Sequence, residues 1–201
     1  MKHITRKTFG RYPSAINIIR LAMSVVLAAV SVFAGHAYNM RRTTNSDGLS
    51  NSAILSLNRD DKGYLWIGTC DGVNIADGVS VSPFSEVFPG MTLSGNIIET
   101  IHNVGQGKNW ILTNYGLDLV DTRRCTVRTF PQFNGQELLC SDSKGNLFVL
   151  GEDSRLFLYD GSDDGDFEEI ASLPHLFNDV KSICVRDNLL WLVTSDGVYT
   201  Y

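Results

Sequence analysis

The stretch GYLWIGTCDGVNIADG, residues 63–78, decides the fold if its pattern returns elsewhere in the chain. It places a tryptophan in a short apolar run, then Gly-Thr, then an Asp-Gly pair and a second apolar run. Asp-Gly between two apolar runs is a strong signal for a two-residue β-hairpin turn. One copy predicts only a hairpin, so the recurrence of the spacing is what matters.

The pattern recurs three times. The later copies are GKNWILTNYGLDLVD (107–121), GNLFVLGEDSRLFLYD (145–160) and NLLWLVTSDGVYTY (188–201). Their aromatic anchors are Trp66, Trp110, Phe148 and Trp191, at separations of 44, 38 and 43 residues. Repeated glycines accompany them, at Gly63, Gly72, Gly116 and Gly197. A period of roughly 40 to 50 residues is typical of β-propeller blades, each built from four strands.

Each repeat divides into short strands separated by turn residues. In the first repeat, AILSLNR, YLWIGT, VNIA and VSVSPF are separated by DDKG and by two Asp-Gly pairs. The sequence therefore predicts an all-β propeller of about three and a half four-stranded blades, over residues 53–84, 97–130, 136–170 and 180–201. A β-sandwich also has regularly spaced strands, but it does not require the same Trp and Gly spacing in every repeat.

Two features indicate an incomplete ring. Propellers have about four to eight blades, and the repeats here supply three and a half. Residues 38–44, YNMRRTT, are expected to form an outer strand for a last blade that is absent. The chain is therefore expected to be the N-terminal part of a larger propeller. Because an unpaired strand edge invites association, the remaining blades and a second copy in a homodimer are the expected protein partners.

The first 37 residues have a different composition. They contain five basic residues and no acidic one, and an apolar run over 21–34 is followed by Gly35 and Ala37. This order predicts a signal peptide over 1–37 and an exported, periplasmic domain over 38–201. An uncleaved membrane anchor is the alternative, although the apolar run is shorter than the roughly 20 residues that a spanning helix needs.

Charge and cysteine content exclude two classes of function. Without residues 1–37, 12 Lys and Arg oppose 22 Asp and Glu, a formal net charge of −10 instead of −5. Nucleic-acid binding rests on Lys and Arg that neutralise phosphates, so no nucleic-acid partner is expected. The four cysteines form no Cys-x-x-Cys pair, which argues against zinc and thioredoxin-type motifs. They are expected to be small buried strand residues, at Cys70, Cys125, Cys140 and Cys184.

Residues 47–78 resemble the opening repeat of the two-component regulator propellers. The matching residues are Asp47-Gly48-Leu49-Ser50, the Asp61-x-Gly63 turn, Trp66-Ile67-Gly68-Thr69 and Asp71-Gly72. The resemblance extends over 38–201 and is weakest in the third repeat. It implies the N-terminal periplasmic sensor region of a Bacteroidetes-type hybrid two-component system, anchored in the inner membrane in its full-length form. It also implies an oligosaccharide ligand, control of glycan-utilisation genes, and a histidine kinase in a domain outside this chain.

The candidate site residues are few. Glu99 and His102 lie at the end of one predicted strand, where they could line a central funnel and bind a sugar hydroxyl or act as acid and base. Tyr115 could stack on a sugar ring. Solvent-facing side chains and packing between blades are the ordinary alternatives for these three residues.

One acidic stretch partly copies a calcium loop. Residues 160–169, DGSDDGDFEE, place Asp160, Asp164 and Asp166 at plausible ligand positions. The twelfth position of such a loop should be a bidentate Glu, but Ala171 stands there. A solvated acidic turn is therefore the expected structure, and neither a metal nor another cofactor is expected.

Two functions remain. The first is a non-catalytic, ligand-sensing propeller, because no nucleophile-elbow, zincin or phosphate-loop motif occurs in the sequence. The second is part of an exported propeller enzyme, a glycosidase or lyase, which needs converging carboxylates or a metal site. The first strands of the repeats carry few charged residues, among them Glu99, Glu137 and Lys181. This scarcity favours sensing.

Overall fold

The computed structural model describes residues 16, 19–20, 23, 42–162, 165–173 and 179–201. The chain divides into two compact units, residues 1–42 and 43–201. In the first unit, Ile16, Ile19, Arg20 and Met23 are helical and exposed, and the rest of the predicted signal peptide lies outside the described residues. Within the described ranges, no helix is both long enough and apolar enough to cross a membrane.

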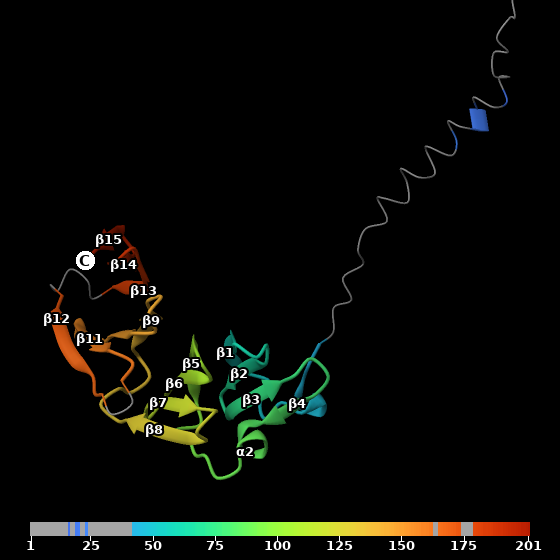
Figure 1. Ribbon diagram of the computed structural model, residues 1–201, viewed down its shortest axis with the longest axis horizontal. Helices are drawn as coiled ribbons and strands as arrows, with labels where there is room; N and C mark the ends of the chain where they lie inside the picture. Colours follow the sequence, from blue (N-terminus) through green and yellow to red (C-terminus); the bar gives the residue numbers. More distant parts are fainter. Residues whose placement is uncertain (1–15, 17–18, 21–22, 24–41, 163–164, 174–178) are drawn as a thin grey trace, which may run out of the picture. The chain divides into compact units, whose positions relative to one another are not determined.

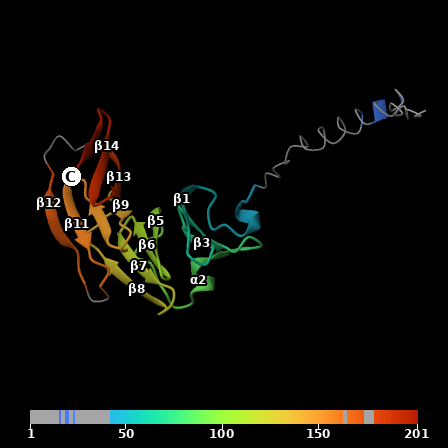
Figure 2. The ribbon, with the colours of Figure 1, turned by 45° about the horizontal axis from the view of Figure 1, so that its top comes forward.

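The second unit is a series of antiparallel β-sheets. The strands of each sheet pair in chain order, so each sheet is a meander; three sheets have four strands and the last has three. This confirms the predicted all-β propeller fold of three and a half blades. Figures 1 and 2 show the blades following one another in an arc, with the first strand of each blade on the concave side.

Blades 1 and 2 are the most regular. Blade 1 lies between the 3₁₀ helix η1 (Asn45–Asp47) and the short helix α2 (Phe84–Val87). Its strands are β1 (Ile54–Arg59), β2 (Leu65–Thr69), β3 (Gly72–Ala76) and β4 (Val81–Pro83). The strands of blade 2 are β5 (Ile98–Gly105), β6 (Lys108–Thr113), β7 (Gly116–Asp121) and β8 (Thr126–Phe130).

Blades 3 and 4 have the same order of strands. Blade 3 consists of β9 (Leu138–Ser141), β10 (Leu147–Leu150), β11 (Arg155–Tyr159) and β12 (Glu168–Ser172). Blade 4 consists of β13 (Val180–Arg186), β14 (Leu189–Thr194) and β15 (Val198–Thr200).

The outer strand expected over 38–44 is not formed in the part that the structure describes. Residues 42–44 have no strand assignment and lead directly into η1, and residues 38–41 lie outside the described residues. A strand is stable only when its backbone groups pair with a neighbouring edge, and in the four sheets no such edge pairs with residues 42–44.

The aromatic anchors occupy one register position in all four blades. Each lies in the second strand, where Trp66 pairs with Ile75, Trp110 with Leu119, Phe148 with Leu158 and Trp191 with Thr200. Trp66 and Trp110 are 1% exposed and belong to hydrophobic clusters that join blade 1 to blade 2 and blade 2 to blade 3. Trp191 is 38% exposed. The anchors therefore fill the spaces between consecutive blades.

A second set of contacts joins the first strands of neighbouring blades. In β1, the side-chain amide of Asn58 donates to the carbonyl of Ile101 in β5, at 2.9 Å. In β5, Nε2 of His102 lies 2.9 Å from Oγ of Ser141 in β9. Asn58 and His102 occupy the same register position, because each pairs with the tryptophan of its own blade. This position therefore provides a polar tie to the next blade.

The segment before each of the first two blades is fixed by a buried polar cluster. Ser50 donates through Oγ to Oδ1 of Asn74 at 2.7 Å, and its Oγ lies 3.5 Å from that of Thr69. In blade 2, 44 residues later, both the backbone N–H and Oγ of Ser94 donate to Asp118, at 2.7 and 2.9 Å. These clusters fix where the connecting segments enter the blades.

The repeated glycines have more than one role. Gly63 and Gly72 have φ of 93° and 91°, which suits the tight turns predicted there. Gly116 and Gly197 are not among the residues with positive φ. At Gly68, an added Cβ would lie 2.7 Å from Cγ2 of Ile98. The glycine of Trp-Ile-Gly-Thr thus lets the first strand of blade 2 approach blade 1.

Candidate functional site

The blades have two structurally different ends. One end, here the turn side, carries the hairpin turns between the first and second strands and between the third and fourth. The other end, the loop side, carries the turns between the second and third strands and the segments that connect blades. Within the described residues, pockets occur on both the turn side and the loop side of the blades.

The loop-side pocket lies between the blade 2–blade 3 connector and the β10–β11 turn. Its volume is about 360 Å³, within the range of about 300–1,000 Å³ that is usual for small-molecule sites. It combines carboxylates, side-chain amides, an arginine and two phenyl rings. It is lined by Gln132, Phe133, Asn134, Glu137, Gly151, Glu152, Asp153, Arg155 and Phe157.

Glu137 fixes the connector that forms one wall of this pocket. Its side chain is only 9% exposed. One carboxylate oxygen accepts the backbone N–H of Asn134 and the other accepts that of Gly135, both at 2.9 Å. The connector therefore has a defined shape, and the carboxylate is held rather than free to swing into the pocket.

Arg155 organises the opposite wall. Its Nε lies 2.5 Å from Oδ2 of Asp153, its Nη1 lies 3.5 Å from Glu169, and its guanidinium carbon lies 5.4 Å from the centre of the Phe157 ring. Desolvation raises the pKa of Asp153, but hydrogen bonds and the charge of Arg155 outweigh it, so the pKa falls below its ordinary value. The Asp153 carboxylate is ionised at neutral pH.

This arrangement suits a neutral, hydroxyl-rich ligand. Carboxylates and side-chain amides exchange hydrogen bonds with hydroxyl groups. Phe133 is buried, at 2% exposed, and packs edge-to-face on the half-buried Phe157, with ring centroids 5.5 Å apart. A second hollow of about 210 Å³ lies on the other side of the β10–β11 turn and shares Gly151 and Glu152 with the first.

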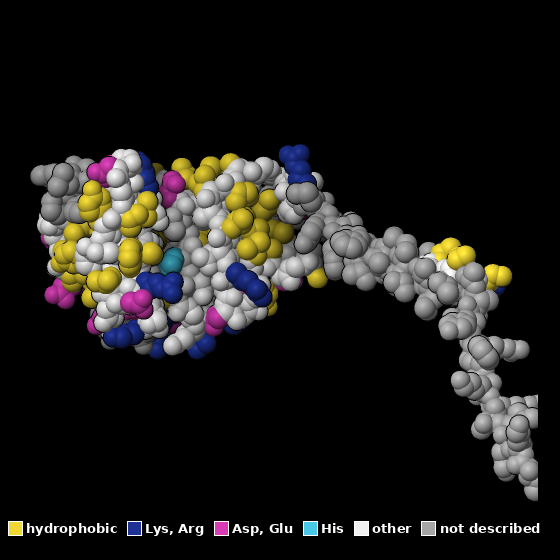
Figure 3. Space-filling view, turned by 90° about the horizontal axis from the view of Figure 1, so that it is seen from above, with side chains coloured by type: hydrophobic (Ala, Val, Ile, Leu, Met, Phe, Trp, Pro, Cys, Tyr) yellow, Lys and Arg dark blue, Asp and Glu magenta, His cyan; other side chains and the backbone are white. Residues whose placement is uncertain are grey.

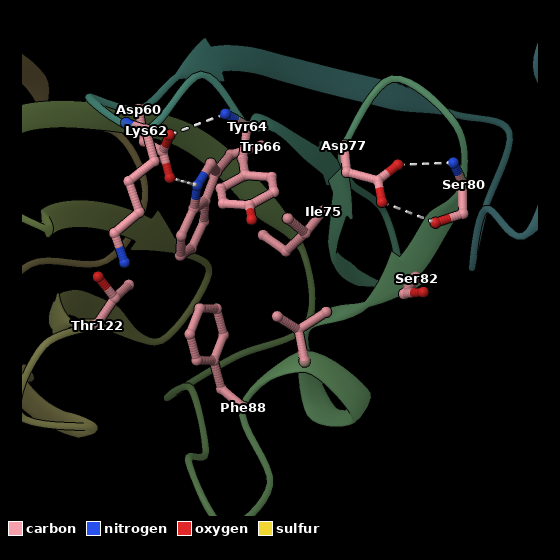
Figure 4. Close-up of a pocket in the computed structure, with 11 residues that line it drawn as sticks. Asp60, Lys62, Tyr64, Trp66, Ile75, Asp77, Ser80, Ser82, Phe88 and Thr122 are labelled. Atoms are coloured by element: carbon pink, nitrogen blue, oxygen red, sulfur yellow. Dashed lines mark hydrogen bonds between the residues drawn. The ribbon is translucent and has the colours of Figure 1, made fainter.

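The turn-side pocket lies between blades 1 and 2 and has a volume of about 350 Å³. Figure 4 shows an open centre surrounded by aromatic, apolar and polar side chains. Trp66 forms part of its floor, and its indole N–H donates to Oδ2 of Asp60 at 3.0 Å. The pocket is lined by Asp60, Lys62, Tyr64, Trp66, Ile75, Asp77, Ser80, Ser82, Val87, Phe88 and Thr122.

The predicted ligand-binding residues line neither pocket. Glu99 is exposed on β5, and its Cγ lies 3.4 Å from where a Cβ on Gly135 would be, so it flanks the same connector from the blade 2 side. Tyr115 is 67% exposed at the β6–β7 turn. His102 is half-buried in its tie to Ser141, and burial lowers its pKa. Ligand binding by Glu99 and Tyr115 remains a prediction. The side chain of His102 instead contacts Ser141 of the next blade.

The predicted calcium candidates do not converge. Oδ1 of Asp160 accepts the backbone N–H of Ser162 at 2.9 Å, and Oδ1 of Asp166 accepts that of Phe167 at 2.8 Å. Asp164 lies outside the described residues. Across the described ranges, no group of three or more His, Cys, Asp or Glu side chains could hold a metal ion.

The cysteines are free thiols. Cys140 is buried in the blade 3–blade 4 cluster, and desolvation raises its pKa to about 12. Cys125 and Cys184 are exposed, which differs from the expectation that all four would be buried. Cys125 lies in the β7–β8 turn and Cys184 on the side of blade 4 that faces away from blade 3.

Residues 48–71 match the model of the family described as "Two component regulator propeller". This segment contains Ser50, Trp66, Gly68 and Thr69, whose roles in the fold are described above. Blade 1 carries a two component regulator propeller repeat. The resemblance seen in the opening repeat, residues 47–78, is thus confirmed over residues 48–71. Among curated proteins, none matches the sequence.

Solved structures share the fold at low sequence identity. The extracellular domain of BT4673 from B. thetaiotaomicron, named as a hybrid two component system, has a TM-score of 0.57 at 19% identity, with 77% of this chain and 21% of that chain covered. PorZ, from the type-IX secretion system of Porphyromonas gingivalis, has a TM-score of 0.57 at 18% identity, with coverages of 79% and 22%. Virginiamycin B lyase from Staphylococcus aureus has a TM-score of 0.54 at 14% identity, with coverages of 75% and 55%.

These similarities establish the fold alone, because proteins with different functions share it. The chain spans only 21–55% of the length of these three structures.

Proposed function

We propose that the chain forms part of the extracellular, ligand-sensing propeller of a hybrid two-component system. The observation that carries this proposal is the two component regulator propeller repeat over 48–71, placed in the first blade of a propeller. The protein is exported to the periplasm through residues 1–37, and its full-length form is anchored in the inner membrane. The histidine kinase belongs to a domain outside this chain.

The proposed ligand is an oligosaccharide, bound at the loop-side pocket, and the proposed output is control of glycan-utilisation genes. The pocket supports this class because its carboxylates, side-chain amides and arginine can form hydrogen bonds with hydroxyl groups. An enzyme would need a carboxylate free to transfer a proton. Glu137, the most buried acid of the pocket, already accepts two backbone N–H groups, so this carboxylate is not free for that role.

The test uses the extracellular region of the complete gene product and a panel of neutral oligosaccharides, with binding measured by calorimetry. Glu152 borders both loop-side hollows, so Glu152→Gln is expected to weaken binding at least tenfold. Glu86→Gln is the matched control, because Glu86 is an exposed acid on α2 that lines neither loop-side hollow. Absence of binding across the panel, or equal affinity in Glu152→Gln and wild type, would contradict the proposal.

A further inference from the structure

The turn-side pocket marks a position where one blade interface lacks an aromatic ring that the next interface contains. Between blades 2 and 3, Tyr159 meets Trp110 edge-on, with ring centroids 5.0 Å apart and planes at 77°. Tyr159 is 2% exposed, and its hydroxyl donates to the carbonyl of Ser162 in the following turn. This interface shows how the fold accommodates a phenol ring beside the anchor tryptophan.

Strand register identifies the equivalent residue between blades 1 and 2. Trp110 pairs with Leu119, and Val120 is the next residue of β7. Phe148 pairs with Leu158, and Tyr159 is the next residue of β11. Val120 therefore stands in blade 2 where Tyr159 stands in blade 3.

Val120 packs in the same cluster as Trp66, as Tyr159 does with Trp110. A valine ends at its two methyl groups, so β7 contributes no ring beside Trp66. The turn-side pocket lies there, with Trp66 on one side and Thr122, two residues after Val120, on the other. Val120 is itself fully buried and does not line the pocket, whereas Thr122 on the same strand face does.

The side chains around Trp66 hold it in a fixed position at the pocket. Phe88 stacks on Trp66 with centroids 5.8 Å apart and planes at 24°. Asp60 accepts the Trp66 indole N–H and the backbone N–H groups of Lys62 and Tyr64. The tryptophan is therefore fixed in orientation, and its hydrogen-bonding need is met without a ligand.

Polar groups lie where a phenol hydroxyl would end. Figure 4 shows the Lys62 side chain and Thr122 on the same side of the open centre. Oγ1 of Thr122 donates to the carbonyl of Gly107 at 3.0 Å, which leaves its lone pairs available to accept. No ion pair of Lys62 occurs among the described residues, so its ammonium can donate to a phenol oxygen.

We propose that the turn-side pocket binds the phenol ring of a tyrosine side chain from a partner polypeptide. The ring enters the pocket beside the half-buried Phe88, because Trp66 is only 1% exposed, and its hydroxyl meets Lys62 and Thr122. The apolar side chains around the pocket are exposed, and only a polypeptide has further residues beside the tyrosine that could cover them. Tyr64, Val79 and Val87 are 42%, 88% and 40% exposed, and the residues that flank a bound tyrosine would cover them.

The test uses the 201-residue chain and two acetylated, amidated five-residue peptides, one with a central tyrosine and one with a central alanine. Saturable binding of the tyrosine peptide is expected, with affinity at least tenfold above that of the alanine peptide. Equal affinities would overturn the proposal. Para-cresol binding as tightly as the tyrosine peptide would overturn the polypeptide as the source of the ring.

Reciprocal substitutions locate the site. Val120→Tyr is expected to fill the pocket from within and weaken peptide binding at least tenfold. Tyr159→Val is expected to open an equivalent pocket beside Trp110 and raise the stoichiometry from one peptide to two. If either variant does not fold, Lys62→Met, which alters only a side chain at the rim, is expected to weaken tyrosine-peptide binding severalfold. Unchanged affinity in the folded Val120→Tyr variant, or in Lys62→Met, would place the ring elsewhere.

Discussion

Single residues set how closely neighbouring blades approach, and Gly68 is the clearest case. A side chain there would meet Oγ of Ser56 at 2.5 Å as well as Cγ2 of Ile98 at 2.7 Å, and both belong to packed first strands. The residue is therefore glycine because of contact between blades, although its φ is not positive. The same sequence motif that marks the family thus has a steric cause.

Gly68→Ala is expected to destabilise the fold by about 1–3 kcal/mol, because inserting a methyl group into a packed core displaces its neighbours. Urea denaturation monitored by tryptophan fluorescence measures this. Gly197→Ala is the control: its nearest neighbour would be Cε2 of Tyr199 at 3.8 Å, so its effect should stay within about 0.5 kcal/mol. Equal effects of the two substitutions would contradict the steric explanation.

His102 makes stability depend on pH. Burial lowers its pKa from the ordinary value of 6.5, so the unfolded chain binds a proton more readily than the folded one. The stabilising contribution is fully present above pH 6.5 and is lost as the pH falls through 6.5 toward the folded-state pKa. Asn58 forms the equivalent hydrogen bond from blade 1 to blade 2. His102→Asn is therefore the matched variant, because it places a residue that does not titrate at the same position.

The free energy of unfolding of wild type is expected to decrease more between pH 7.5 and pH 5 than that of His102→Asn. Chemical denaturation at several pH values measures both. Parallel pH profiles of the two proteins would show that His102 does not titrate in this window.

At the scale of elements, each of the first two blades depends on a polar cluster that fixes its entering segment. Asp118 is fully buried and accepts hydrogen bonds from Ser94 and from Thr129. Blade 1 uses Asn74, 44 residues earlier, for the same contact with Ser50. An uncharged acceptor therefore suffices at this position.

Asp118→Asn is expected to cost less than about 1 kcal/mol, whereas Asp118→Ala should cost about 1–3 kcal/mol, because it removes the fully buried acceptor of the Ser94 backbone N–H and of the Ser94 and Thr129 hydroxyl groups. Thermal unfolding of both variants checks the difference. A loss in Asp118→Asn as large as in Asp118→Ala would mean that the negative charge itself is required.

The sequence allows the blades to be predicted better than the pockets. The spacing of Trp66 and Trp110 can be read directly from the sequence. Ser50 and Thr69 recur 44 residues later as Ser94 and Thr113, a signal that could have revealed the clusters. The loop-side pocket could not be predicted in this way. Its walls, at Asn134 and Asp153, come from a connector and a turn that do not follow the repeat, because blade 3 departs from the spacing of the first two.

At the scale of the whole chain, the blade series exposes an apolar face at each end of the second unit. In blade 1, Asn58 and Trp66 face blade 2, so the alternating Leu57 and Leu65 point away from it and are 60% and 37% exposed. In blade 4, alternate residues of β14 are exposed. Figure 3 shows hydrophobic side chains gathered toward both ends of the second unit.

These two faces are the two halves of one kind of interface. Within the series, the face of each blade that carries the anchor residue packs on the opposite face of the next blade. Trp191 and Val193, 38% and 41% exposed, thus stand on the half that would meet a face like that of Leu57. The 201-residue chain is therefore expected to associate head to tail, with blade 4 of one copy on blade 1 of another, in a contact that forms closed or open assemblies.

In a head-to-tail contact, the exposed face of blade 1 always meets the exposed face of blade 4. A substitution on either face should therefore disrupt every contact. Leu57→Lys and Val193→Lys are each expected to reduce self-association at least tenfold by themselves, as measured by sedimentation velocity over a range of concentrations. Val79→Lys makes the same kind of change at an 88% exposed residue of the β3–β4 turn and should leave association unchanged. If only one of the two face variants has an effect, the contact joins like faces and is isologous; if neither has, the exposed faces do not drive association.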